Sequence, residues 1–126
     1  MSPMARVWLI TAAAYGLLAV ALGAFGAHGL RAKLAPEMMA VYRTAVEYQF
    51  YHALALLAVA LLALRATSPW LNVAGYAFGS GVILFSGSLY LLAVTGTRWL
   101  GAITPLGGVA LLLGWFALLV YAWQAR

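Results

Sequence analysis

Four long apolar stretches, each preceded by a proline, limit what this chain can fold into more than any other feature. The stretches cover about residues 7–27, 48–64, 70–94 and 103–123, and the prolines are Pro3, Pro36, Pro69 and Pro105. A membrane span needs about 20 apolar residues to cross about 30 Å of hydrocarbon. In lipid such a segment must be helical, because its backbone polar groups find no water to bond. Each apolar stretch is therefore predicted to be a transmembrane helix.

The prolines also predict where the helices begin. Proline is favoured in the first turn of a helix, where its missing N–H would have no partner. Three of the prolines follow or adjoin a good N-cap residue, namely Ser2, Ser68 and Thr104. The fold class predicted is all-α: an antiparallel bundle of four transmembrane helices, which start near the four prolines. An even number of spans places both termini on the same side of the membrane.

The composition agrees with a membrane protein. Of 126 residues, 67% are hydrophobic and 7% are charged, whereas soluble domains are about half apolar and about a quarter charged. A soluble chain of this length has too little interior to hide so much apolar surface. We expect one domain, residues 1–126, integral to a plasma (inner) membrane as a multi-pass protein.

The charge of the chain indicates contact with lipid and not with nucleic acid. The net charge is +5, from seven basic and two acidic residues. The basic residues stand singly near the ends of the apolar stretches, which is typical of contact with lipid phosphates. Similar numbers on the two sides leave the orientation open. Interfacial tryptophans are expected on the side of the termini (Trp8, Trp70, Trp123) and on the other side (Trp99).

The second helix is longer than a bilayer requires. A helix from Pro36 to Leu64 exceeds the hydrocarbon core by roughly 13 Å, at about 1.5 Å per residue. We therefore expect an interfacial start, about residues 36–47, among the lipid headgroups.

Small residues line two of the predicted helices. The first helix has Ala12, Gly16, Ala19, Gly23 and Gly26 on one face, and the third has the run Gly75-Tyr-Ala-Phe-Gly79. Small residues let membrane helices approach closely. These faces predict tight packing, either inside one bundle or against a second copy or another membrane protein.

Polar side chains gather where the first helix ends and the second begins. The candidate ligand-binding residues are His28, Arg43, Glu47, Gln49, His52 and, at the start of the fourth helix, Thr104. Antiparallel packing brings these helix ends to one side, and ionisable groups inside a membrane favour a functional interpretation. Structural alternatives stay open. Arg43 and Glu47 have ion-pair spacing, His28 is placed to cap a helix end, and His52 suits a hydrogen-bonded core position.

The sequence offers little for catalysis or metal binding. Glu47 and His52 are five residues apart and point in different directions from a helix, so no metal site is predicted. The chain has no cysteine, which excludes thiolate sites. Nucleotide-binding motifs and a hydrolytic triad are not recognisable. We expect no cofactor and no enzymatic activity.

Three runs of residues resemble a known family. They are Gly-Ala-Phe-Gly-Ala-His-Gly-Leu at 23–30, Thr-Ala…Tyr-Gln…His at 44–52, and Thr-Pro-Leu-Gly-Gly at 104–108. They are similar to the small four-helix membrane proteins catalogued as domain of unknown function 423. The resemblance covers nearly the whole chain and implies an integral membrane protein with four spans. It implies no established activity or site.

Two functions are therefore expected from the sequence. The first is a non-enzymatic membrane module whose polar cluster binds a small ligand, an ion or a lipid headgroup, with transport by a homo-oligomer as an extension. The alternative is a structural or assembly partner that docks on another membrane protein through the small-residue faces.

Overall fold

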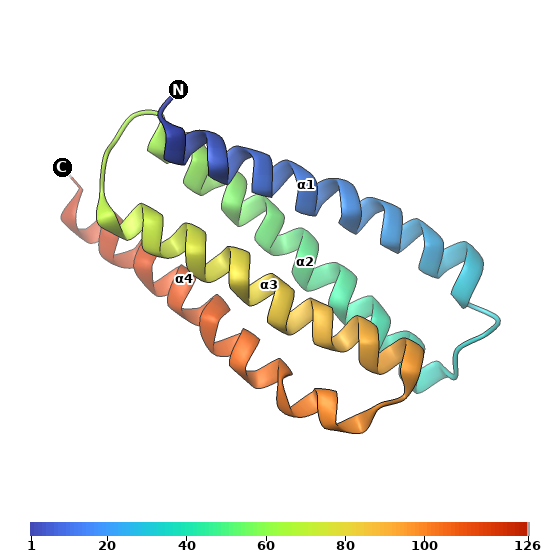
Figure 1. The fold of residues 1–126 in the computed structure, drawn as a ribbon. Helices are drawn as coiled ribbons and strands as arrows, with labels where there is room; N and C mark the ends of the chain where they lie inside the picture. The colour runs from blue at the N-terminus through green and yellow to red at the C-terminus, as the bar shows by residue number, and fades with distance from the viewer. Residues whose placement is uncertain (126) are drawn as a thin grey trace.

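Four long helices make up the computed structural model, which describes residues 1–125. The helices are α1 (Pro3–Phe25), α2 (Pro36–Ala63), α3 (Pro69–Thr95) and α4 (Thr104–Gln124). A π-helical turn, η1 (Gly26–Leu30), continues α1, and a 3-10 turn, η2 (Arg98–Ala102), leads into α4. Both chain ends lie at the end of the bundle that carries the α2–α3 connection (Figure 1). The predicted all-α bundle with its termini on one side is confirmed.

The helices begin where their prolines predict. Each helix starts at its proline or one residue before it. The hydroxyls of Ser2 and Ser68 accept backbone N–H groups of the first turns of α1 and α3, as N-caps do. The expected cap at Thr104 is wrong, because α4 has no side-chain cap. The Thr104 hydroxyl is instead hydrogen bonded to that of Ser88 in α3, at 2.6 Å.

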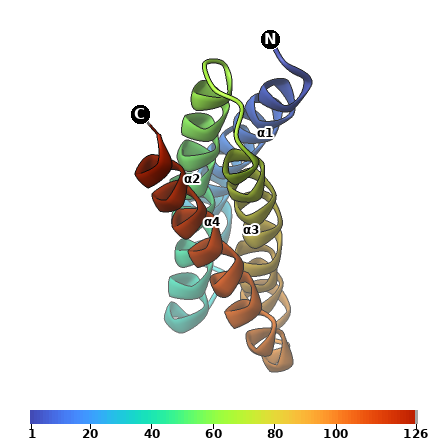
Figure 2. The same ribbon diagram turned by 90° about the vertical axis from the view of Figure 1, so that its left-hand side faces the viewer.

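The helices pack in chain order. Helix α1 lies against α2, α2 against α3, and α3 against α4, while the backbones of α1 and α3 are farther apart and are bridged by the side chains of Trp8 and Tyr15. Figure 2 shows α4 running obliquely across the other helices. All four helices are long and apolar enough to cross a membrane. Many of their large apolar side chains are exposed, as a lipid-facing surface requires.

Three glycines bring α3 and α4 together. A Cβ added to Gly107 of α4 would overlap the backbone at Phe85, and one added to Gly114 would overlap the ring of Phe78. On α3, a Cβ at Gly81 would overlap Leu111 of α4. Glycine is required at these points because the two helices approach so closely. The position of α4 is thus set by α3.

The small-residue faces are used mostly inside the bundle. Ala12, Ala19 and Gly26 are buried, and a Cβ at Gly23 would lie 3.3 Å from Val46 of α2. The exception on α1 is Gly16, where a Cβ would meet nothing within 4 Å. Close packing of α1 on α2 therefore accounts for most of this face.

Of the two glycines of α3, Gly75 is covered inside the bundle and Gly79 is not. The indole of Trp8 lies directly over Gly75, so that a Cβ there would overlap it, whereas Gly79 has open space around its Cα. Trp8 is only 3% exposed and its N–H donates to Asn72 Oδ1 at 3.3 Å. Trp8 therefore packs its ring in the core, in the space above Gly75. Its expected depth at the membrane interface stays a prediction.

Helix α2 runs from Pro36 to Ala63 as one continuous α-helix. The expected interfacial segment, residues 36–47, is therefore collinear with the rest of the span. Its location among lipid headgroups stays a prediction.

Candidate functional site

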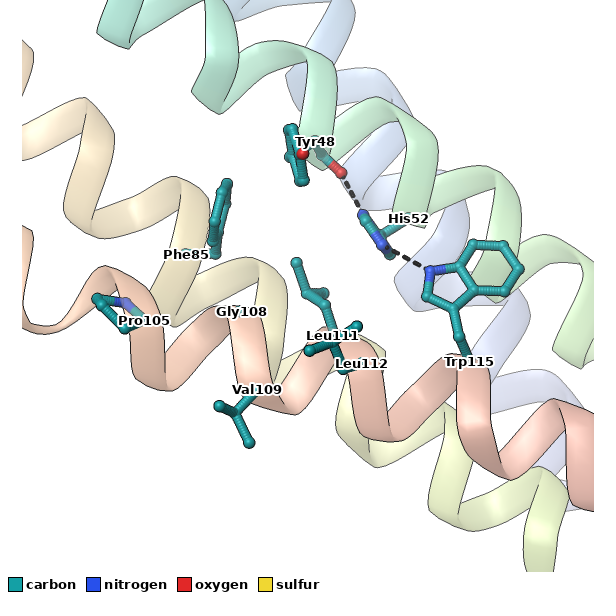
Figure 3. Close-up of a pocket in the computed structure, with 9 residues that line it drawn as sticks. All are labelled: Tyr48, His52, Phe85, Pro105, Gly108, Val109, Leu111, Leu112 and Trp115. Atoms are coloured by element: carbon teal, nitrogen blue, oxygen red, sulfur yellow. Dashed lines mark hydrogen bonds between the residues drawn. The ribbon is translucent and has the colours of Figure 1, made fainter.

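The imidazole of His52, near the middle of α2, is an ionisable group inside the bundle. It is only 5% exposed. Its Nδ1 lies 2.7 Å from the backbone oxygen of Tyr48, and its Nε2 lies 3.0 Å from the indole Nε1 of Trp115 in α4 (Figure 3). A carbonyl oxygen only accepts hydrogen bonds and an indole N–H only donates them. The imidazole is therefore neutral, with its proton on Nδ1 and its Nε2 accepting from α4.

His52 and Trp115 form one end of a groove bounded by α2, α3 and α4. The groove has a volume of about 490 Å³. Its lining residues are Tyr48, His52, Phe85, Pro105, Gly108, Val109, Leu111, Leu112 and Trp115. Figure 3 shows Tyr48 and His52 of α2 and Phe85 of α3 around this space, with Trp115 reaching His52 from α4. None of them carries a formal charge, so the groove suits an uncharged, largely apolar guest.

The groove is open on the side that faces lipid. The side chain of Trp115 is 49% exposed, and that of Leu112 is also exposed. The small residues Pro105 and Gly108 leave space at the other end of the groove. The groove is therefore accessible from outside the bundle along α4.

Aromatic packing holds the polar pair in place. The ring of Phe78 lies 5.5 Å from His52 and 5.2 Å from Trp115, centroid to centroid. Further along, the rings of Tyr48 and Phe85 stack at 4.6 Å. Such pairs restrict ring orientation. His52 is thus packed against Phe78 inside the bundle, whereas Trp115, which is half exposed, forms the edge of the groove on α4.

Gln49, about one turn before His52 on α2, belongs to a different hydrogen-bonded system. Its side chain is 4% exposed; its Nε2 donates to the Tyr15 carbonyl at 2.9 Å, and its Oε1 accepts from the Tyr90 hydroxyl at 2.6 Å. The Tyr15 hydroxyl in turn donates to the carbonyl of Gly79 at 2.6 Å. These bonds join α1, α2 and α3, which makes Gln49 a structural residue.

The six predicted binding residues do not converge on one site. His28, Arg43 and Glu47 are exposed, and no ion pair joins Arg43 to Glu47 in the part of the chain that the structure covers. Arg43 borders a small recess of about 120 Å³ between α1 and α2. Thr104 is engaged with α3, so only His52 reaches the groove.

Trp115 was not predicted as a site residue, although it completes the site. In the sequence it is one more apolar residue of the last span. A usable signal exists, because an indole N–H placed inside lipid needs an acceptor. The same reasoning applies to the hydroxyls of Tyr15 and Tyr90. Choosing the acceptor, however, requires knowing which helices are neighbours.

No metal centre is found among residues 1–125, where His, Cys, Asp and Glu do not gather in threes. The imidazole of His52 has both nitrogens engaged with protein groups.

Comparison with known proteins establishes the family. The model of a family described as a protein of unknown function (DUF423) matches residues 22–108, which include all of α2 and α3. The chain belongs to the DUF423 family. The match covers His52 and the groove as far as Gly108, and it confirms the resemblance drawn from the three sequence runs.

Relatives of this DUF423 chain extend along nearly its whole length. The UPF0382 membrane protein YwdK of Bacillus subtilis (strain 168) is 48% identical over 118 residues, which are 93% of this chain and 96% of that protein. The UPF0382 inner membrane protein YgdD of Escherichia coli (strain K12) is 44% identical over 117 residues, 93% of this chain and 89% of that protein. No solved structure matches.

These names agree with the four apolar helices. The DUF423 chain is an integral, multi-pass membrane protein. The naming of YgdD as an inner membrane protein agrees with the plasma (inner) membrane expected from the sequence.

Proposed function

We propose that this DUF423 protein is a non-enzymatic binding module, which takes a small membrane-soluble ligand in the groove between α2 and α4. The observation that carries the proposal is the neutral imidazole of His52, whose acceptor nitrogen lies at the wall of a lipid-accessible groove of about 490 Å³. Volumes of about 300–1,000 Å³, apolar walls and a few placed polar groups are typical of small-molecule sites.

The proposed site differs from the one expected at the ends of α1 and α2. His28, Arg43 and Glu47 lie on the outside of the protein, and they do not face one another around a cavity. The groove has no charged lining residue. An ion or a charged headgroup would have to leave water for a site with no opposite charge, which is costly in lipid. An uncharged ligand avoids that cost.

The attachment of α4 supports ligand entry. Helix α4 is docked on α3 through Gly81, Gly107 and Gly114. Towards α2, its side-chain hydrogen bonding in residues 1–125 is limited to the bond from Trp115 to His52. A guest can therefore enter between α2 and α4 without breaking the α3–α4 contact. Transport by a homo-oligomer is an extension of this proposal.

Native mass spectrometry of the protein released from nanodiscs tests the proposal. The wild-type protein is expected to carry a bound small molecule, and Gly108→Leu is expected to lose it by filling the groove. The nearest atoms to a Cβ at Gly108 are 3.9 and 4.0 Å away, so the backbone tolerates the change. Gly87→Leu is the matched control, since a Cβ there meets nothing within 4 Å. A wild-type protein without adduct, or an adduct equally present in Gly108→Leu, would contradict the proposal.

Assembly with another membrane protein or with further copies of the chain is the alternative proposal. It is supported by Gly16 and Gly79, the members of the small-residue faces at which an added Cβ would meet nothing within 4 Å. Gly79→Leu is then expected to abolish co-purification of the partner. An unchanged pull-down, with the fold intact, would count against assembly through this face.

A further inference from the structure

We infer that the ligand of the groove is an uncharged amphiphile with a hydroxyl group, and that this hydroxyl inserts between Trp115 Nε1 and His52 Nε2. The inference rests on the proposed function and specifies the chemical class of the ligand. It follows from the hydrogen-bonding capacities of the two side chains at the end of the groove, and from the absence of charge in its lining.

The two facing groups have opposite and fixed roles. The indole N–H of Trp115 can only donate, and Nε2 of His52 can only accept while the Tyr48 carbonyl holds the proton on Nδ1. If a guest separates them, each needs a new partner, because the hydrocarbon of the bilayer offers none and an unsatisfied buried polar group is unfavourable.

A hydroxyl meets both needs at once. Its oxygen accepts from the indole N–H while its hydrogen is donated to Nε2. An ether or ketone oxygen only accepts, and it would leave Nε2 without a donor. A protonated amine donates but brings an unpaired charge into an uncharged groove. A hydroxyl therefore fits the pair better than an ether, a ketone or a protonated amine does.

The required movement is small. Two hydrogen bonds of ordinary length around a hydroxyl oxygen place the two nitrogens roughly 5 Å apart, compared with 3.0 Å in the structure. The extra distance can come from the Trp115 side chain, which is half exposed and free on its lipid side. Phe78, which packs on both rings, keeps His52 in place.

The rest of the groove accommodates the apolar body of the ligand. From His52 the groove extends along α4 past Leu112 and Gly108 to Pro105, with the stacked rings of Tyr48 and Phe85 on the opposite wall. A hydroxyl at the His52 end thus places a hydrocarbon chain or ring system over apolar side chains. Burial of that body supplies affinity, and the hydroxyl supplies selectivity.

A matched pair of photoreactive probes tests the inference. The probes are a long-chain alcohol that carries a diazirine and the methyl ether of the same alcohol, each added to the full-length protein in phosphatidylcholine nanodiscs. After irradiation, mass spectrometry locates the labelled peptides. The alcohol is expected to label groove residues of α2 and α4 at least several-fold more than the ether does.

Variants of His52 test whether the preference for the alcohol over the ether depends on the imidazole. His52→Phe is expected to reduce the alcohol-to-ether ratio to about one, and His52→Gln, which retains an acceptor, is expected to restore part of it. His28→Ala, at an exposed position outside the groove, is the control and should leave the ratio unchanged. Because His52→Phe removes a buried hydrogen-bonding residue, the indole N–H resonance of wild-type Trp115 serves as a second measurement. It should shift differently with the alcohol and with the ether.

The outcomes distinguish the selection of a hydroxyl from the binding of any ligand in the groove. Equal labelling of the groove by both probes in the wild-type protein would overturn selection of a hydroxyl and leave the proposed binding function standing. Absence of groove labelling by either probe would overturn both. A preference for the alcohol that persists in folded His52→Phe would place its origin elsewhere and overturn the assignment to this pair.

Discussion

The indole N–H of Trp115 donates to Nε2 of His52 over 3.0 Å, and in residues 1–125 it is the one side-chain hydrogen bond that joins α4 to α2. Three consequences follow from that arrangement. It determines the tautomer of the imidazole, it fixes the distance between the two helices at the open side of the groove, and it supplies the polar end of the candidate binding site.

Replacement of Trp115 by Phe is expected to destabilise the protein by about 1 kcal/mol, because Nε2 of His52 loses its donor while an aromatic ring remains against Phe78. Unfolding in detergent or bicelles measures the change. Trp123→Phe is the control, since the Trp123 side chain is 87% exposed. The same loss of stability in both variants would show that the hydrogen bond contributes nothing specific.

The tautomer of His52 is itself a prediction. Solid-state nitrogen NMR of the protein in bilayers at neutral pH is expected to show a protonated Nδ1 and an unprotonated, hydrogen-bonded Nε2. Trp115→Phe should shift the Nε2 resonance, while the resonances of exposed His28 stay where they are. An Nε2–H tautomer in the wild-type protein would contradict the geometry, because two N–H donors would then face each other.

Gln49→Leu is expected to destabilise the α1–α2–α3 part of the bundle by about 1 kcal/mol, because it leaves the Tyr90 hydroxyl without its acceptor. The double variant with Tyr90→Phe should recover part of that loss, since removing both partners costs less than removing one. The readout is the unfolding free energy of the single and double variants. Gln124→Leu, at an exposed position of α4, is the control. If the two substitutions simply add, the hydrogen bond has no energetic role.

Gly107 and Gly108 are neighbours with opposite expected responses to alanine. Gly107→Ala places a Cβ against the backbone of α3 at Phe85 and is expected to cost about 1–3 kcal/mol. Gly108→Ala meets only ordinary contacts at 3.9 and 4.0 Å, and it is expected to be neutral or stabilising because alanine favours a helix. Thermal unfolding of the two variants side by side checks the difference. Similar melting temperatures would mean that α4 does not approach α3 as closely as described.

The number, length and starting points of the helices were predictable from local features. Apolar length specifies a span, and the prolines with Ser2 and Ser68 mark helix starts by local hydrogen bonding alone. No knowledge of the neighbouring helices is needed for either conclusion. The same local logic failed at Thr104, whose hydroxyl has a partner in α3 that no local rule could anticipate.

The candidate site was predictable only in part, because it depends on which faces of the helices meet. In lipid the outside and the inside of a bundle are both apolar, so the sequence carries little periodic signal for helix rotation. His52 was recognised as suited to a core position, and both His52 and Gln49 are buried. Their separation into two hydrogen-bonded systems depends on where α1 and α4 lie around α2. The partner Trp115 follows from that placement.

The packing of the helices in chain order has a consequence for biosynthesis. As the chain enters the bilayer from its N-terminus, each new helix finds its main partner already inserted, and few contacts have to wait for distant sequence. Some polar side chains do have to wait: the Trp8 N–H and the Tyr15 hydroxyl of α1 bond to α3, and the acceptor nitrogen of His52 waits for α4. It arrives with α2 and stays without its indole partner until α4 has been synthesised. The last helix to be made therefore supplies the hydrogen-bond donor that His52 lacks while only the first three helices are in the bilayer.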